Sequence, residues 1–536
     1  MKISLPQLTV RAVVVGILGL LVITSSSMYV ALRMGALPWP TVFVTIVSLA
    51  IIGRFKNSNL NEINLTHTIM SSGAMVAGGL AFTIPGIWMR NPEATVSVSY
   101  LLIITISGAL LGTLFSIVAR KKYVEGEQLP YPMGQAAYRT LISATQNRKE
   151  AVVLFSAMAF AILFTVLRDR FGIIPPALML YAGGALVAPL YIWLSPMAAG
   201  IGAIIGPALS LFWLGGAVFA FLILEPLGIR AGLFADLGAA ELFRQNLGIG
   251  LMVGTGLAII VKFIAQMIRN RGKKQEERSG DAAILFGGRM KWVSLGLMAA
   301  VVLVLAASGT VPFFAALLLI IGIYVTTQIA ALLTGQTGIN PMEILGILVL
   351  LLVQLVTNVT IVQGFSVAAV TAIACGLAGD LMNDTKSGYL LKTDAKTQII
   401  AEGIGGVIGA VVAVIALLVL KESFGGFGTE ALPAPQAKAV SAMVGGLTHV
   451  PAFVTGALIG LILYLVGLPS ATLGLGVYLP FSISSIMGAG AILYMIAAGA
   501  FGKKRDIKGT TGLLASGFLG GEGITGVVIA IIAMLS

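Results

Sequence analysis

The chain consists of long apolar stretches separated by short polar connectors. An apolar run of about 20 residues can cross the hydrocarbon core of a bilayer as an α-helix, whereas a strand of a membrane barrel shows about ten residues of alternating polarity. We therefore interpret the stretches as helices and expect an all-α, polytopic transmembrane helical bundle. The pattern predicts about 16 spans, at 10–33, 36–54, 65–88, 97–119, 150–167, 172–194, 197–224, 247–268, 292–308, 312–334, 340–356, 360–382, 397–420, 446–467, 471–500 and 512–535.

Composition supports a membrane protein. Hydrophobic residues make up 58% of the 536 residues and charged residues 10%, whereas soluble domains contain about 45–50% apolar and about 25% charged residues. The single cysteine, Cys375, excludes a disulfide-rich secreted scaffold. The first apolar run is long enough to span and lacks the small-residue cleavage site of a signal peptide. We therefore expect a multi-pass protein of the inner (cytoplasmic) membrane, embedded in the lipid bilayer.

The net charge of +12 could indicate a nucleic-acid partner, but the basic residues lie mostly in short connectors between apolar runs. This distribution follows the positive-inside rule of membrane proteins. The most basic connector runs from Arg269 to Lys291, near the middle of the chain. We expect no nucleic-acid partner, and the sequence is compatible with a homo-oligomer.

Short similarities recur in the same order in the two halves of the chain. They pair Met28–Val30 with Ile323–Val325, Asn64–Thr66 with Asn358–Thr360, Leu129–Pro132 with Leu432–Pro435, Gly202–Pro207 with Gly474–Pro480, and Gly250–Ile259 with Gly520–Ile529. Ordered matches of this kind are typical of an internal duplication. We expect a first transmembrane repeat at 1–268, a basic cytoplasmic connector with a linking helix at 269–310, and a second transmembrane repeat at 311–536.

Several kinds of chemistry are excluded by motif. The chain has no P-loop and no H-E-x-x-H motif, and two histidines with one cysteine make a zinc or copper site of soft ligands improbable. We expect no enzyme activity, no cofactor and no metal site, and an ion gradient as the energy source for transport. An ion-pumping enzyme with an acid pair that holds Mg²⁺ and a phosphorylated substrate is a weaker alternative.

Ionisable side chains at membrane depth are the informative candidates, because each is costly unless it is paired or hydrated. Asp380 and Asp384 are four residues apart and share one helix face, where two like charges favour uptake of a proton. Lys386 could neutralise the pair. We predict that these three residues couple transport to protons; the alternative is a solvated helix end with Lys386 facing the cytoplasm.

Other polar residues in apolar surroundings are candidates for substrate contact. His67 could relay a proton or simply pack, and Glu522 lies deep in a glycine-rich apolar run. Glu402 lies near a helix start, where a carboxylate is favourable in any case. Tyr29 and Tyr324 occupy matching positions in the two halves and could face a shared cavity, or they could anchor the helices at the membrane interface.

The segment from Gly335 to Glu343 is a polar, glycine-containing break between two apolar runs. Such breaks occur in the discontinuous helices of transporters, where the exposed helix N-terminus can bind a carboxylate. Asn340 and Glu343 are therefore candidates for substrate binding. The alternative is a tight connector with Asn340 as N-cap, Pro341 at the first helical position and Glu343 at the third.

Several of these motifs together resemble the oligopeptide transporter family, which includes the yellow-stripe-like metal-chelate carriers. The run G-D-L-M-N-D-T-K-S-G-Y-L-L, Gly379 to Leu391, followed by Gln398, is similar to the family's G-D-L-M-x-D-x-K-T-G pattern. Asn61 to Gly73 looks like the family's N-N-x-x-Q-T-x-x-S-A-G segment, and Ile84 to Trp88 and the two Leu-Pro-x-Pro stretches also fit. The resemblance covers nearly the whole chain and implies secondary active uptake, usually proton-coupled.

The combined expectation is a secondary active transporter that imports short oligopeptides with protons. Uptake of peptide-like metal chelates or siderophore-like complexes is the alternative. The predicted substrate contacts are Tyr29, His67, Tyr324, Asn340, Glu343 and Glu522.

Overall fold

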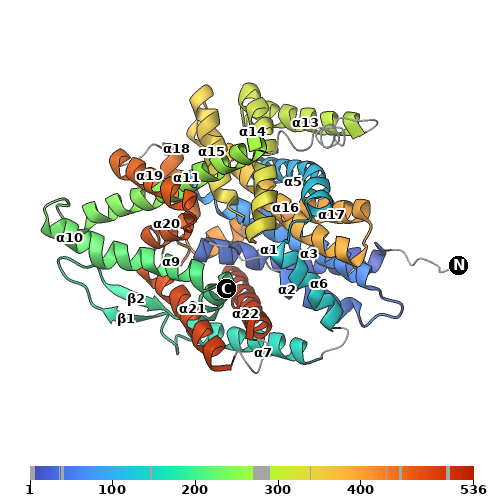
Figure 1. Ribbon diagram of the computed structural model, residues 1–536, viewed down its shortest axis with the longest axis horizontal. Helices are drawn as coiled ribbons and strands as arrows, with labels where there is room; N and C mark the ends of the chain where they lie inside the picture. The colour runs from blue at the N-terminus through green and yellow to red at the C-terminus, as the bar shows by residue number, and fades with distance from the viewer. Residues whose placement is uncertain are drawn as a thin grey trace. The chain divides into compact units, whose positions relative to one another are not determined.

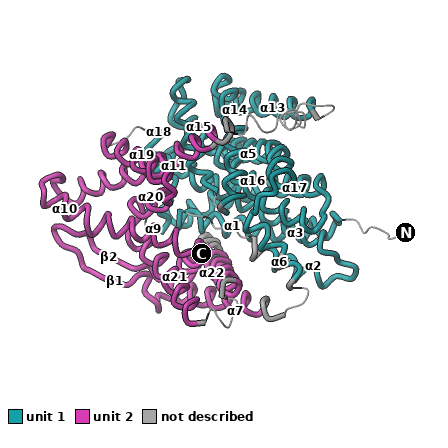
Figure 2. The backbone as a smooth tube through the Cα atoms, viewed as in Figure 1, with its two compact units in different colours: residues 1–148, 267–444, 530–536 teal, residues 149–266, 445–529 magenta. Residues whose placement is uncertain are grey.

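The computed structural model describes residues 7–35, 37, 41–144, 148–269, 290–338, 340–429, 431–445, 449–501 and 507–535. These residues are mainly helical (Figure 1). Most of the predicted connector between Arg269 and Lys291 lies outside the described residues. The described chain divides into two compact units (Figure 2): unit 1 comprises Met1–Arg148, Met267–Val444 and Ala530–Ser536, and unit 2 comprises Lys149–Gln266 and Gly445–Ile529.

Unit 1 contains segments from both halves of the sequence. From the first half come α1 (Val10–Met34), α2 (Thr41–Ile52), α3 (Leu60–Ala81), α4 (Pro85–Arg90), α5 (Val98–Ala119) with a π-helical extension (Arg120–Gly126), and α6 (Pro132–Ala144). From the second half come α13 (Met290–Ala307), α14 (Phe313–Thr337), α15 (Met342–Val356), α16 (Ile361–Leu391), α17 (Ala395–Ser423) and α18 (Pro435–Gly445).

Unit 2 is divided between the halves in the same way. From the first half come α7 (Arg148–Thr165) with a π-helical turn (Val166–Arg170), β1 (Ala177–Tyr181), β2 (Leu190–Trp193), α8 (Pro196–Ile205), α9 (Pro207–Val218) with a second π-helical turn (Phe219–Leu224), α10 (Glu225–Arg230) and α11 (Leu237–Arg269). From the second half come α19 (Val450–Leu465), α20 (Ser470–Tyr478), α21 (Phe481–Phe501) and α22 (Ile507–Leu535).

Within the described residues, ten helices are long and apolar enough to cross a membrane, and four more are apolar but shorter: Pro196–Ile205, Lys291–Ala307, Met342–Val356 and Val450–Leu465. The polytopic helical architecture is therefore confirmed, while the finer count of about 16 spans stays a prediction.

One predicted span has a different structure. The stretch 172–194 forms no helix, and instead β1 and β2 pair as an antiparallel hairpin. Pro175 and Pro176 precede the first strand, and Gly183, with φ +91°, lies in the turn. Proline cannot donate a backbone hydrogen bond inside a helix and glycine is costly there. The span prediction failed because it weighed apolar content and ignored these helix breakers.

The centre of unit 1 is formed by α3 and α16, which pack against each other. α3 also contacts α1 and α17, and α16 also contacts α5, α14 and α15. Almost every residue of α3 is buried, as is nearly all of α16 between Gly364 and Gly388. A helix that is buried on all faces needs no polar side, so the polar residues on α3 and α16 require another explanation.

Two turns of unit 1 have the same unusual conformation. Tyr131 and Ala434 have φ values of +43° and +42°, in the left-handed region that non-glycine residues rarely adopt. The Tyr131 N–H donates to the Gly335 carbonyl at 2.9 Å, and the Ala434 N–H donates to the Leu32 carbonyl at 2.8 Å. The sequence separation between the two donors equals that between the two acceptors.

Candidate functional site

Asp380 and Asp384 lie inside α16 rather than at its end. The helix begins with a capping box between Thr360 and Gln363 and continues to Leu391, so both carboxylates are more than one turn from either terminus. Both side chains are completely buried. The alternative of a solvated helix end therefore does not describe their position.

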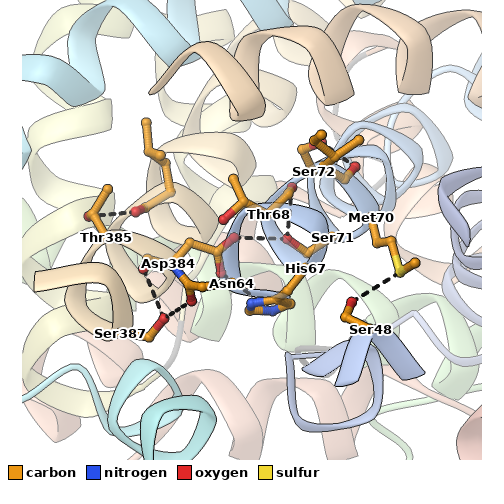
Figure 3. Close-up of polar contacts among 12 residues, drawn as sticks. Ser48, Asn64, His67, Thr68, Met70, Ser71, Ser72, Asp384, Thr385 and Ser387 are labelled. Atoms are coloured by element: carbon orange, nitrogen blue, oxygen red, sulfur yellow. Dashed lines mark hydrogen bonds and ion pairs between the residues drawn. The ribbon is translucent and has the colours of Figure 1, made fainter. Parts of the chain in front are cut away.

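α3 brings a hydroxyl and an imidazole to Asp384 (Figure 3). The Ser71 hydroxyl donates to Asp384 Oδ2 at 3.1 Å, and His67 Nε2 lies 3.6 Å from Asp384 Oδ1. His67 and Ser71 are four residues apart, which places both on one face of α3. His67, Asp380 and Asp384, predicted separately from the sequence, thus lie close together.

The backbone of α16 at this point is held from two sides. The Gln398 amide on α17 donates to the Asp384 carbonyl at 2.7 Å and to Thr68 Oγ1 at 3.2 Å. The Ser387 hydroxyl donates to the Asn64 amide oxygen. These bonds fix α16 relative to α3 and α17 while leaving the carboxylates of the site unused.

A third carboxylate, that of Glu402, joins the pair. One oxygen each of Asp380, Asp384 and Glu402 lies within 4.8 Å of the other two, and all three residues are buried. From the sequence, Glu402 is an isolated acid near a helix start. The missed signal was its spacing: Glu402 follows Gln398 by four residues, and so shares the face of α17 that contacts Asp384.

The cluster contains more polar atoms than hydrogen bonds. Among the described residues, both oxygens of Asp380 and of Glu402, Asp384 Oδ1 and both nitrogens of His67 have no hydrogen-bond partner. The ammonium of Lys386 donates to the Gln128 carbonyl at 3.4 Å and forms no ion pair with these acids. Three buried carboxylates cannot all be ionised without compensating positive charge. The arrangement is therefore suited to reversible binding of protons or of one small cation.

Outside the cluster, Asp394 caps the N-terminus of α17. Its carboxylate accepts hydrogen bonds from the Thr397 N–H at 2.8 Å and the Thr397 hydroxyl at 2.7 Å. These bonds, the hydroxyl bond first, lower the pKa of Asp394 below its ordinary value. Asp394 is thus an ionised, capped carboxylate on the same helix as Glu402.

Tyr29 and Tyr324 are not part of the carboxylate cluster. The Tyr29 ring packs against Phe424 with 6.0 Å between ring centroids, and its hydroxyl accepts a hydrogen bond from Arg33 at 3.1 Å. The Tyr324 ring packs edge-on against Phe115 at 5.4 Å. Both ring contacts join the two halves of the sequence within unit 1. Neither contact involves an acid of the cluster.

Asn340 and Glu343 lie at the break between α14 and α15. α14 ends at a left-handed Gly338, and α15 begins with Pro341 in the cap position and no side-chain cap bond. Asn340 therefore does not cap α15. Its amide donates to the Cys375 carbonyl on α16 at 2.7 Å, while Glu343 lies in the first turn of α15.

Glu522 belongs to unit 2, and its carboxylate has partners at both oxygens. Arg168 Nη1 lies 2.9 Å from Glu522 Oε1, and the Ser195 hydroxyl contacts both carboxylate oxygens. The Met197 N–H also donates to Oε2 at 2.9 Å. Sequence inspection missed this ion pair because Arg168 is remote in the chain.

These features define a multi-pass helical membrane protein with an acidic cluster enclosed by three central helices. The family model described as OPT oligopeptide transporter protein matches residues 7–533. The chain belongs to this family, as its motifs predict. A Haemophilus influenzae protein that carries the provisional name of an oligopeptide transporter is 25% identical, over 95% of this chain and 93% of its own length. Both names indicate a transporter rather than an enzyme.

Proposed function

We propose that this protein imports short oligopeptides across the inner membrane in a proton-coupled, secondary active cycle. The observation that carries the proposal is the buried cluster on α3, α16 and α17. Among the described residues, no lysine or arginine donates a hydrogen bond to Asp380 or Asp384. Carboxylates that must gain protons when enclosed, and can lose them when open to water, would link proton movement to alternating access. The peptide substrate is inferred from the names of the family and the relative.

The six predicted substrate contacts remain proposals of unequal strength. His67 is the strongest, because it lies beside Asp384. Asn340 and Glu343 lie at a helix break, where a peptide carboxylate could meet the N-terminus of α15. Tyr29 and Tyr324 would contact the substrate from α1 and α14 of unit 1. Glu522 is the weakest, because Arg168 already neutralises it.

The proposed duplication provides the framework for such a cycle. In unit 1, Tyr131 and Ala434 occupy equivalent positions in the two halves, as do Leu32 and Gly335. Tyr131 bonds to Gly335, and Ala434 bonds to Leu32, so each hydrogen bond joins one half of the sequence to the other. In unit 2, α8 packs on α21 while α9 packs on α20. A swap of this kind is expected when two repeats are interwoven, each contributing to both units. Transporters built from repeats commonly alternate access by moving one bundle against another.

The test is charge movement in proteoliposomes after addition of a mixture of di- to hexapeptides, with and without an inward proton gradient. A saturable, proton-dependent current supports the proposal. A current with iron or nickel chelates, and none with peptides, would indicate chelate uptake instead of peptide import. Flux without saturation or counterflow would indicate a passive channel.

Asp380→Asn tests the coupling role. We expect this variant to lose proton-driven accumulation of peptide and to retain counterflow exchange, because asparagine cannot take up and release the proton that the proposed coupling assigns to Asp380. Asp394→Asn, which keeps a capping residue at the exposed start of α17, is the matched control and should behave as wild type. Equal loss of accumulation and exchange in Asp380→Asn would indicate a structural role instead.

A further inference from the structure

Glu402 is the carboxylate of the buried cluster that has no role in the coupling scheme above. It lies on α17, its side chain is completely buried, and neither of its oxygens has a hydrogen-bond partner among the described residues. Its carboxylate is within 4.8 Å of those of Asp380 and Asp384, which lie on α16. A buried acid in this position affects the charge of both neighbours.

The helices packed against α17 provide little positive charge to this cluster. α3 contributes His67, and α5 has no charged residue between Val98 and Ala119. On α1, the guanidinium of Arg11 is paired with Glu62. The same helix carries Arg33 at its opposite end, where it donates to the Tyr29 hydroxyl.

On α16, besides Asp380 and Asp384, the charged group is Lys386, whose ammonium donates to the Gln128 carbonyl. His67 is therefore the one basic group with a contact to the cluster among the described residues of these helices. Its Nε2 lies 3.6 Å from Asp384 Oδ1, but a neutral ring adds no charge. The compensation must come from mobile cations.

Repulsion among the carboxylates determines how many charges are needed. In a buried site, carboxylates this close repel one another when ionised, so each additional negative charge is harder to accommodate. Among the described residues of the packed helices no fixed cation is paired with Asp380 or Glu402, so two or three ionised carboxylates would be far less favourable than one. The enclosed cluster therefore requires at least two protons.

We infer that Glu402 is a third proton-binding residue, and that Asp380, Asp384 and Glu402 together bind two exchangeable protons. Each proton forms an O–H bond with a carboxylate oxygen when the site is enclosed and returns to water when the site opens, with no redox change. The proton count is independent of the substrate. A transport ratio of two protons per peptide also requires that the proposed function, peptide import, is correct.

The first experiment needs no peptide. Proteoliposomes on a solid-supported membrane are given a pH jump, and the charge displaced per protein is compared between wild type, Glu402→Gln and Asp394→Asn. We expect Glu402→Gln to displace about half the wild-type charge, because two carboxylates share one proton, while Asp394→Asn displaces the wild-type amount. Direct dye titration of the proton release of wild-type protein should give two protons per chain.

The second experiment measures the reversal potential of the peptide current at several proton gradients. We expect a ratio of two protons per peptide in wild type and one in Glu402→Gln. Two-proton displacement without any peptide current would overturn peptide import while supporting the inference.

Three results would overturn the inference. One is that folded Glu402→Gln displaces the same charge as wild type. Another, which needs no variant, is that wild-type protein releases one proton per chain in the dye titration. The third is stoichiometric Mn²⁺ binding, followed by electron paramagnetic resonance, that Glu402→Gln abolishes. This result would identify a metal ion, rather than protons, as the compensating cation.

Discussion

Individual buried acids in this protein are compensated in two different ways. In unit 2, Glu522 is paired with Arg168, and Glu225 is paired with Arg244 at 2.7 Å. In unit 1, Asp380 and Glu402 have no such partner among the described residues. A paired acid is stabilised permanently by its arginine, whereas an unpaired one changes state when its surroundings change. The difference separates paired from unpaired buried charge, and it supports the proposal that coupling occurs in unit 1.

The structural role of the Arg168–Glu522 pair can be tested by removing one partner. Arg168→Met leaves the Glu522 carboxylate buried without a cation, and we expect a loss of about 3–5 kcal/mol in unfolding free energy. Arg168→Met/Glu522→Gln should recover much of this loss, because the second change removes the isolated charge. Thermal unfolding in detergent, followed by tryptophan fluorescence, measures both effects. A stable Arg168→Met variant, with weaker peptide binding in Glu522→Gln, would instead favour the predicted substrate role of Glu522.

At the scale of helices, close approach depends on glycine. A Cβ added at Gly409 of α17 would overlap Gly73 Cα of α3, and one added at Gly405 would overlap the Ser72 hydroxyl. These crossings bring α17 against α3 one to two turns beyond Glu402, and small residues are what allow membrane helices such contact. The site thus depends on glycines that carry no chemistry themselves.

We expect Gly409→Ala to force α17 away from α3 and to cost about 1–3 kcal/mol of stability, as overpacking does. Proton-driven transport should decline with it, because Glu402 moves with the helix. Gly296→Ala on α13 is the matched control: a Cβ there meets no atom within 4 Å, and alanine is the better helix former. Thermal unfolding and transport rates of both variants provide the measurement. Equal behaviour of the two would show that the crossing tolerates a methyl group.

The helical elements were the most predictable part of the structure, because a bilayer requires apolar runs of fixed length. The hairpin at 172–194 was missed, since apolar content alone does not distinguish a span from strands flanked by proline and glycine. The four-residue spacing of Asp380 and Asp384 predicted that they share one helix face, and both lie on α16; their coupling role stays a prediction. The four-residue spacing from Gln398 to Glu402 indicates a shared face of α17, but which helix that face meets, like the pairing of Glu522 with Arg168, depends on contacts between segments distant in sequence.

Across the whole molecule, the compact units do not coincide with the halves of the sequence. Unit 1 combines 1–148 with 267–444, and unit 2 combines 149–266 with 445–529. The helices at the centre of unit 1, α3 and α16, come from different halves, as do α9 and α20 in unit 2. Sequence similarity could suggest a duplication, but it could not indicate that each unit combines segments of both halves.

This interweaving predicts how the protein behaves when it is divided. Residues 1–269 and 290–536, expressed as separate chains, would each leave the buried faces of α3 or α16 exposed, because the partner helix lies on the other chain. We expect each chain alone to aggregate, and the two together to co-purify as a monodisperse complex with part of the wild-type proton-dependent current. Size-exclusion chromatography and the proteoliposome assay measure these outcomes. A half that is monodisperse alone would contradict interwoven repeats. It would show that the buried faces of α3 or α16 can be covered by helices of the same half.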